Sequence, residues 1–257
     1  MIKQNDILAD LHMHTVASIH AYSTVQEMIE ASKKAGYKYI AITDHLFQCD
    51  DVILRKNENA RIEYLSNRMR YEPIKVIGGV ELNLNQNIPY IDKYKRAQCW
   101  MPVGLHSWFV HFKEGQLATL VPMFKKFADE KNCTAFAHIE RDFYKFGENY
   151  RELNSEVKLV LEEIVKIAVA NNIPLELNET SFLLNTEELK EKIYYWLSFA
   201  KDLNATIYLG SDAHYSSEVG HFENVIKAIN GIKYPEDKII NLDPIKLDKI
   251  VPDVLKN

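Results

Sequence analysis

Short apolar runs that end in a histidine or an acidic residue recur along the whole chain, and this pattern limits the folds open to it. Seven of the nine histidines lie at such places. Helix-like stretches separate several of the runs, which favours parallel strands whose carboxyl ends share one edge. Histidine is also the side chain that most often binds transition metals in proteins. The sequence therefore predicts that residues far apart in the chain meet at a metal site.

The elements themselves follow from the spacing of apolar residues. We expect seven strands, at residues 7–11, 39–43, 75–82, 101–105, 134–137, 173–177 and 206–209. Helical spacing predicts helices at residues 116–131, 155–170, 186–203 and 218–230. Another helix begins at Ser23, where Ser23 and Gln26 match a capping box and Gly36 suits the position after the helix end. We expect residues 47–74 to form a loop with one irregular helix. The alternation is typical of an α/β fold with a parallel sheet or barrel.

Composition excludes several classes of protein. The 257 residues, 47% hydrophobic and 26% charged, suit one large globular domain or two smaller ones. The net charge of −5 argues against a broad nucleic-acid-binding surface. No stretch reaches the roughly eighteen apolar residues of a membrane span, and the first residues lack a signal-peptide core. Cys49, Cys99 and Cys133 are typical of reduced thiols, although Cys49 lies near enough to His45 to be a conceivable ligand. We expect a cytoplasmic protein.

Strand geometry brings the first and last clusters together. Residues i and i+2 of a strand point to the same side. His12 and His14 therefore face together after the first strand, and Asp212 and His214 do so after the last. At the barrel mouth such pairs converge despite a separation of about 200 residues.

Other candidates occupy comparable places in the chain. These are His20, His45, Glu81, His106 and His138. A single histidine at a strand end is usually an ordinary hydrogen-bonded residue, and His111 and His221, which lie elsewhere, keep that interpretation. A series at consecutive strand ends is hard to attribute to chance and predicts a site with more than one metal ion.

The chain resembles the PHP-domain (polymerase and histidinol phosphatase) family of metal-dependent phosphoesterases in six ordered segments: DLHMHT, ITDH, GVEL, GLH, AHIE and GSDAH. The opening run DLHMHTVASIHAYST and the later LELNETSF are especially similar to YcdX-type bacterial phosphatases. The motifs extend from residue 10 to residue 221. The resemblance implies one domain over residues 1–257, a distorted (β/α)7 TIM-like barrel with its metal site at the carboxyl ends of the strands.

The resemblance also implies three divalent ions, most often zinc, with manganese or iron as substitutes. The implied ligands are His12, His14, Glu81 and Asp212 for the first ion; Glu81, His106 and His138 for the second; and His20, His45 and His214 for the third. All nine positions hold the expected residue type, which argues against a degenerate, metal-free protein.

Three polar residues beside these ligands are candidates to orient them. Asp10 and Asp44 are placed as carboxylates that hold neighbouring ligands, or they are exposed turn acids. Asn178, two residues after Glu176, faces the mouth in the same way, or both residues cap the strand end.

The segment after His138 departs from the family. Ile139 stands where relatives often have proline, and residues 139–151 are longer, more aromatic and more basic than in YcdX-type relatives. Loops at this end of a barrel carry substrate selectivity. Arg141, Lys145 and Arg151 would bind a second anionic group of the substrate, or they are ordinary loop charges.

Together these features predict hydrolysis of a small phosphomonoester. The attacking group would be a metal-bridging hydroxide held by Glu81, with His12 and His138 nearby, and the third ion would bind the ester. The sequence offers no serine or cysteine nucleophile motif. Alternatives are a PHP-type nuclease, a histidinol-phosphate phosphatase, and a non-catalytic metal-binding protein. A homo-oligomer is implied by the YcdX-type resemblance alone, and nothing suggests a membrane partner.

Overall fold

The structure, a computed structural model, describes residues 1–18, 20–45, 62, 64–84, 91–106, 115–184 and 186–256. Parallel strands form two sheets within these residues. The first sheet consists of β1 (Ala9–Met13), β2 (Tyr39–Ile42) and β3 (Lys75–Gly78). The second consists of β4 (Leu82–Asn83), β5 (Pro102–Gly104), β6 (Ala135–Phe136), β7 (Leu175–Asn178) and β8 (Ile207–Gly210). An α/β fold with parallel strands is thus confirmed.

The strand expected at residues 75–82 divides into β3 and β4. At the end of β3 the chain exchanges hydrogen bonds with Trp100, two residues before β5: Trp100 N donates to Gly78 O and Val80 N donates to Trp100 O. Gly79 permits this close approach, because a Cβ there would lie 2.7 Å from Trp100 O. The prediction of one strand was wrong because the chain changes neighbours between Gly78 and Leu82. The break leaves Glu81 beside His45, to which it forms a parallel bridge.

Backbone hydrogen bonds also join the first and last strands. Asp212 N donates to His12 O at 2.8 Å, and His14 N donates to Ala213 O at 2.9 Å. The end of β1 therefore runs beside the segment that follows β8. This pairing brings the two clusters of predicted ligands into contact.

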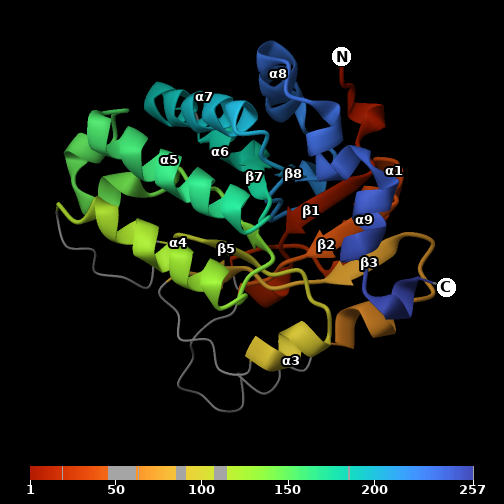
Figure 1. Cartoon of the computed structure of the whole chain (residues 1–257). Coiled ribbons are helices and arrows are strands. Elements are labelled where there is room, and N and C mark those ends of the chain that lie inside the picture. Colours follow the sequence, from red (N-terminus) through yellow and green to blue (C-terminus); the bar gives the residue numbers. More distant parts are fainter. Residues whose placement is uncertain are drawn as a thin grey trace.

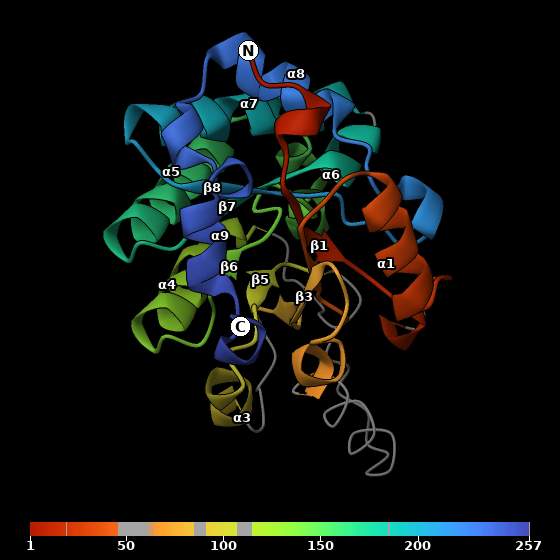
Figure 2. The same cartoon turned by 90° about the vertical axis from the view of Figure 1, so that its right-hand side faces the viewer.

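Helices flank the strands on two sides. They are α1 (Val25–Lys34), α3 (Ile91–Arg96), α4 (Leu120–Asp129), α5 (Ser155–Ala170), α6 (Glu179–Leu183), α7 (Glu187–Asp202), α8 (Glu223–Ile232) and α9 (Pro244–Ile250), and residues 64–68 are also helical. Figures 1 and 2 show α4, α5 and α7 on one side of the strands and α1 on the other. No helix in the described part of the chain is long and apolar enough to cross a membrane.

Several helix starts differ from the prediction, among them that of α4, which begins at Leu120 rather than at residue 116, after a 3-10 helix over Leu117–Thr119. Helix α1 is capped by Thr24, which forms the capping box with Glu27, whereas Ser23 accepts a hydrogen bond from Ser216 N. Helix α8 begins at Glu223 rather than at residue 218, because the Glu179 carboxylate accepts hydrogen bonds from the backbone at its first turn. Gly36 has a φ of +85° after α1, as the C′ position requires.

The side chain of Asn241 connects β1 and β8. Its fully buried amide donates to Ala9 O and Leu209 O and accepts from Leu209 N. The side chain therefore satisfies backbone groups of both β1 and β8. A residue that lies after the last strand in sequence thus fixes the first strand against the last.

We expect Asn241→Ala to lower the free energy of unfolding by at least about 2 kcal/mol, because it leaves buried backbone groups without partners. Urea denaturation followed by circular dichroism measures the change. Asn67→Ala, on the exposed face of residues 64–68, serves as the control and should stay within about 0.5 kcal/mol. Equal stability of the two variants would refute the bridging role of Asn241.

Candidate metal site

The Glu81 carboxylate lies at the centre of the predicted ligands and is almost completely buried. Its oxygens lie within 3.3 Å of imidazole nitrogens of His12, His14, His45, His106 and His138. The shortest of these contacts joins Glu81 Oε1 to His138 Nε2 at 2.6 Å. One carboxylate thus contacts side chains that follow or end β1, β2, β5 and β6.

The three remaining predicted ligands, Asp212, His214 and His20, extend this network from His14. Asp212 Oδ1 lies 3.2 Å from His14 Nε2 and 3.6 Å from His214 Nδ1. His20 Nε2 lies 2.6 Å from His214 Nε2. All nine predicted ligands are therefore linked through Glu81 and Asp212.

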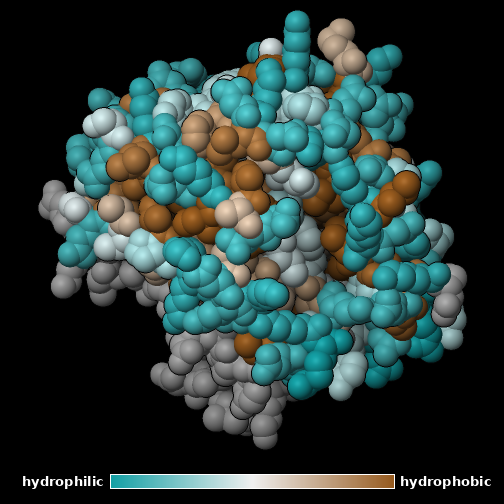
Figure 3. All heavy atoms as spheres, viewed as in Figure 1, coloured by the Kyte–Doolittle hydropathy of each residue, from teal (hydrophilic) through white to brown (hydrophobic). Residues whose placement is uncertain are grey.

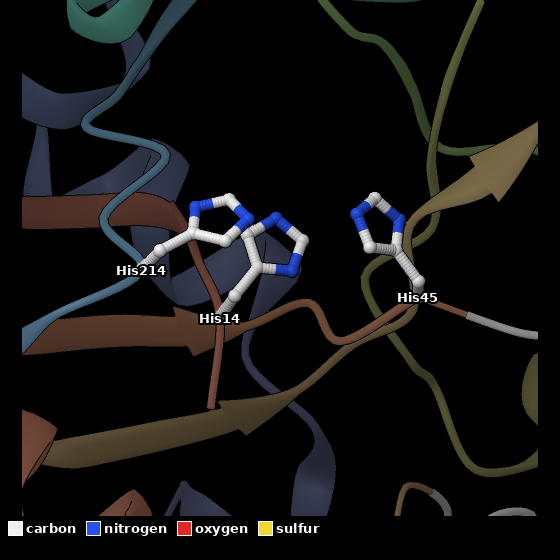
Figure 4. A group of neighbouring side chains, drawn as sticks. All are labelled: His14, His45 and His214. Atoms are coloured by element: carbon white, nitrogen blue, oxygen red, sulfur yellow. The ribbon is translucent and has the colours of Figure 1, made fainter. Parts of the chain in front are cut away.

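Four overlapping triads have donor atoms within 4.8 Å of one another. They are His12, His14 and Asp212; His12, Glu81 and His138; His45, Glu81 and His106; and His14, His45 and His214. Figure 4 shows the last triad, with the rings of His14 and His214 side by side and His45 facing them from beyond β2. The predicted third set of ligands was His20, His45 and His214, whereas this triad contains His14 instead of His20. His20 contacts the triad through His214.

Histidine tautomers provide a test of whether these side chains suit a metal. His20 Nδ1 donates to the carbonyl oxygen of Ser18, and His214 Nδ1 donates to that of Asp212. A neutral imidazole that donates through Nδ1 has a lone pair at Nε2. In that tautomer the two Nε2 lone pairs face each other at 2.6 Å, and a proton on one ring or a metal ion bound by both would relieve their repulsion. Imidazole and carboxylate donors fit zinc, manganese or iron.

The buried hydroxyl of Ser18 fixes the tautomer of His14. Ser18 Oγ donates to Asp44 Oδ1 at 2.7 Å and therefore accepts from His14 Nδ1 at 2.9 Å. Asp44 also accepts two hydrogen bonds from Thr15. The predicted orienting role of Asp44 thus operates through Ser18, which sequence reasoning missed because no spacing rule identifies it.

Glu176 plays the corresponding role for His12. Its Oε1 lies 2.6 Å from His12 Nδ1, and its Oε2 accepts from His138 N at 3.0 Å. Sequence reasoning considered Glu176 only beside Asn178, as a residue of the strand end. The signal was available, because Glu176 is an acid inside an apolar strand. The Asp10 carboxylate instead accepts hydrogen bonds from the backbone N–H groups of His12 and Ser211. It therefore positions the backbone rather than an imidazole ring.

Arg141 lies in the site as a hydrogen-bond donor to three side chains. Its guanidinium donates to Asp212 Oδ2 at 2.7 Å, Asn178 Oδ1 at 2.6 Å and Ser181 Oγ at 2.8 Å. Burial would raise the pKa of Asp212, but Arg141 and His12 hold that pKa well below its usual range. Asn178 both caps α6 and contacts this group.

Lys145 and Arg151 lie on the exposed side of the same segment. Arg151 pairs with Glu148 and covers the ring of Tyr144, over which Lys145 also lies. The segment forms two short 3-10 helices, η5 (Phe143–Phe146) and η6 (Glu148–Tyr150). The aromatic rings of Phe143, Phe146 and Tyr150 are buried. Anion binding by Lys145 and Arg151 stays a prediction.

The electrostatic field of the site attracts cations. Burial would lower the pKa of His14, but hydrogen bonds to Asp212 and Glu81 raise it to about 9. Burial would raise the pKa of Glu81, yet His106 and His12 hold it well below its usual range. Glu81 and Asp212 are therefore ionised, and positive charge is favoured at His12 and His14, whereas burial lowers the pKa of His20, His45 and His214.

Backbone geometry and small residues make room for these side chains. His138 and Asp212 have φ values of 26° and 57°, a conformation that costs about 1–3 kcal/mol outside glycine and gathers at functional sites. A Cβ on Gly104 would lie 2.6 Å from the His138 ring, and one on Gly210 would overlap Glu176. Residues 104 and 210 must therefore be glycine for the His138 ring and the Glu176 carboxylate to take their places.

Of the other histidines and cysteines considered, His111 and Cys49 lie outside the described residues. His221 is exposed beside Glu223, as expected of an ordinary surface residue. Cys99 and Cys133 are free and buried, away from the ligands.

Comparison with known proteins identifies the family. Residues 10–180 match the model of the PHP domain, and the chain belongs to this family. It is 29% identical over 247 residues to a probable phosphatase of Proteus mirabilis (strain HI4320), covering 93% of this chain and 91% of that protein. A probable phosphatase of Edwardsiella ictaluri (strain 93-146) is 28% identical over 240 residues, covering 91% and 90%.

Solved structures share the fold at lower identity. The histidinol phosphate phosphatase of Lactococcus lactis subsp. lactis, complexed with zinc, L-histidinol and phosphate, aligns with a TM-score of 0.63 and 16% identity, covering 88% of this chain and 94% of that one. The metal-dependent tyrosine phosphatases YwqE from Bacillus subtilis and CpsB from Streptococcus pneumoniae give a TM-score of 0.53 and 14% identity, covering 97% and 94%. These likenesses establish a common fold.

We expect Gly210→Ala to lower metal occupancy, because the added methyl group displaces Glu176 from His12. Elemental analysis of the purified protein gives the number of ions per chain. Gly231→Ala is the matched control, since a Cβ at position 231 has no atom within 4 Å. Occupancy that is the same in both variants and the parent protein would contradict the requirement for glycine at 210.

Proposed function

We propose that this protein is a metal-dependent phosphoesterase that hydrolyses small phosphomonoesters. Membership of the PHP family and the relatives named as probable phosphatases support the reaction class. The observation that carries the proposal is the buried Glu81 carboxylate, with five imidazoles within 3.3 Å of it. Such a buried anion suits a cluster of divalent cations more than it suits a structural core.

We infer a centre of three ions, with zinc as the expected metal and manganese or iron as substitutes. The assignment is His12, His14, Glu81 and Asp212 for the first ion; Glu81, His106 and His138 for the second; and His20, His45 and His214 for the third. Close contacts of Glu81 with both His12 and His138 support its place as the shared ligand. The converging lone pairs of His20 and His214 support a third ion.

When bound, the ions would supply Lewis-acid stabilisation of the phosphoryl oxygens and activation of a water molecule. In the reaction, a water oxygen bonds to phosphorus, the ester P–O bond breaks, and the leaving oxygen takes a proton. The chain's own residues set the geometry. Glu176 and Ser18 turn His12 and His14 so that their Nε2 atoms converge at 3.0 Å, and Arg141 holds Asp212.

The proposal extends to the architecture. We propose that the two parallel sheets together form the distorted (β/α)7 barrel of a single domain over residues 1–257. Its support is the pairing of the end of β1 with the segment after β8, together with a core cluster that includes residues from Ile2 to Ile239. The acidic charge of −5 favours a small phosphorylated substrate over a nucleic acid.

We expect Glu81→Gln to reduce kcat/KM for a chromogenic phosphomonoester by at least about a thousandfold, because an amide cannot replace a bridging carboxylate. Glu163→Gln, at a partly exposed position on α5 where the side chain pairs with Lys166, is the control and should keep full activity. The proposal fails if the Glu81 variant hydrolyses the ester as fast as the control in metal-replete buffer.

Removal of metal should abolish turnover reversibly. After dialysis against a chelator, we expect activity to fall to background and to return on addition of zinc or manganese salts. Circular dichroism before and after dialysis checks that the chain stays folded. Full activity in protein shown by elemental analysis to be free of metal would rule out metal-dependent hydrolysis.

Arg141→Met distinguishes a positioning role from substrate binding. Because Arg141 neutralises and holds Asp212, we expect the variant to bind metal about tenfold more weakly while KM at saturating metal changes little. Metal titrations of activity measure both quantities. A raised KM with unchanged metal affinity would instead assign Arg141 to the substrate phosphate.

A further inference from the structure

A cavity of about 700 Å³ lies at the end of the strands opposite the candidate metal site. Its walls include residues just before β5, β6, β7 and β8, namely Met101, Thr134, Pro174 and Thr206. The predicted metal ligands instead follow or end their strands. Helix α9 forms another wall, and Figure 2 shows this helix in front of the strands near the C-terminus. The cavity is therefore separate from the metal site.

The floor of the cavity is apolar and ordered. Trp100, Met101, Ile240 and Val251 line it and are at most 6% exposed. The indole of Trp100 is fixed by a hydrogen bond from Nε1 to Leu11 O. In Figure 3 the area between α5 and α9 is recessed, with pale and brown side chains inside and hydrophilic ones around it.

The charged residues of the wall all have one sign. Lys95, Lys131, Lys246 and Lys249 line the cavity, and no aspartate or glutamate is among the described residues that do so. This excess of positive charge occurs in a chain with a net charge of −5. A concave surface lined by one sign of charge concentrates ions of the opposite sign.

Two of these lysines have protein partners and two are available to a ligand. Lys95 Nζ donates to Asn132 Oδ1 at 2.7 Å, and Lys246 Nζ lies 3.8 Å from Asp243 Oδ2. Lys131 and Lys249 are exposed and form no ion pair with any residue in the described part of the chain. The ammonium groups of these two lysines therefore have no carboxylate of the described residues within ion-pair distance.

We propose that this cavity binds a small organic anion that carries an apolar, flat body. The volume falls in the range of about 300–1,000 Å³ found for small-molecule sites. The body of the ligand would lie on Trp100 and its neighbours, and the anionic group would lie between Lys131 and Lys249. The site is independent of the proposed phosphatase reaction.

Fluorescence titration with 8-anilinonaphthalene-1-sulfonate, an aromatic sulfonate without a phosphate, tests the proposal on the metal-replete protein. We expect saturable binding at one site. Lys131→Glu combined with Lys249→Glu should weaken the dye affinity at least fivefold. Lys34→Glu combined with Lys227→Glu makes the same change of charge on exposed lysines outside the cavity and should alter the affinity less than twofold. Thermal unfolding checks the fold of both variants.

The uncharged dye N-phenyl-1-naphthylamine separates anion binding from simple apolar contact. We expect it to bind the parent protein at least fivefold more weakly than the sulfonate. Equal affinity of the two dyes, or equal loss of sulfonate binding in the two double variants, would overturn the proposal. So would sulfonate binding that disappears when the metals are chelated, since the dye would then lie at the metal site.

Discussion

The buried charge of Glu81 is the constraint on which the rest of the site depends. A carboxylate taken out of water costs several kcal/mol unless opposite charge surrounds it, and here the surroundings are imidazoles. His12 lies in β1 and His14 follows it, His45 follows β2, and His106 and His138 follow β5 and β6. A single side chain thus fixes where four strand ends must meet. In the proposed function, divalent cations would complete this balance of charge.

Around this centre, hydrogen bonds at Nδ1 fix the rings of His12, His14, His20 and His214. Glu176 and Ser18 hold the outer nitrogens of His12 and His14, which turns the inner nitrogens toward Glu81 and toward each other. Arg141 supplies a permanent positive charge behind Asp212. Side chains that would otherwise repel or rotate are therefore held in place before any ligand arrives. Such preorganisation is what a metal centre for hydrolysis requires.

The sequence predicted the candidate ligands because strand ends and alternation depend on local pattern. Helix α5 was predicted at its observed bounds, since its apolar spacing and Asn154 cap are local signals. The break at Gly79 was missed because it depends on Trp100, a partner distant in the sequence. Ser18 and Arg141 were also hard to assign, since their partners are set by tertiary contacts. Features built from distant partners leave no periodic trace in one sequence.

The most direct test of the account is a crystal structure of the protein purified with its metals, with anomalous diffraction data at the zinc, manganese and iron edges. The account predicts three anomalous peaks, two of them sharing the Glu81 carboxylate and the third beside His20 and His214. A fully occupied site in which Glu81 coordinates no ion, or a metal-replete crystal without anomalous peaks at these residues, would contradict it.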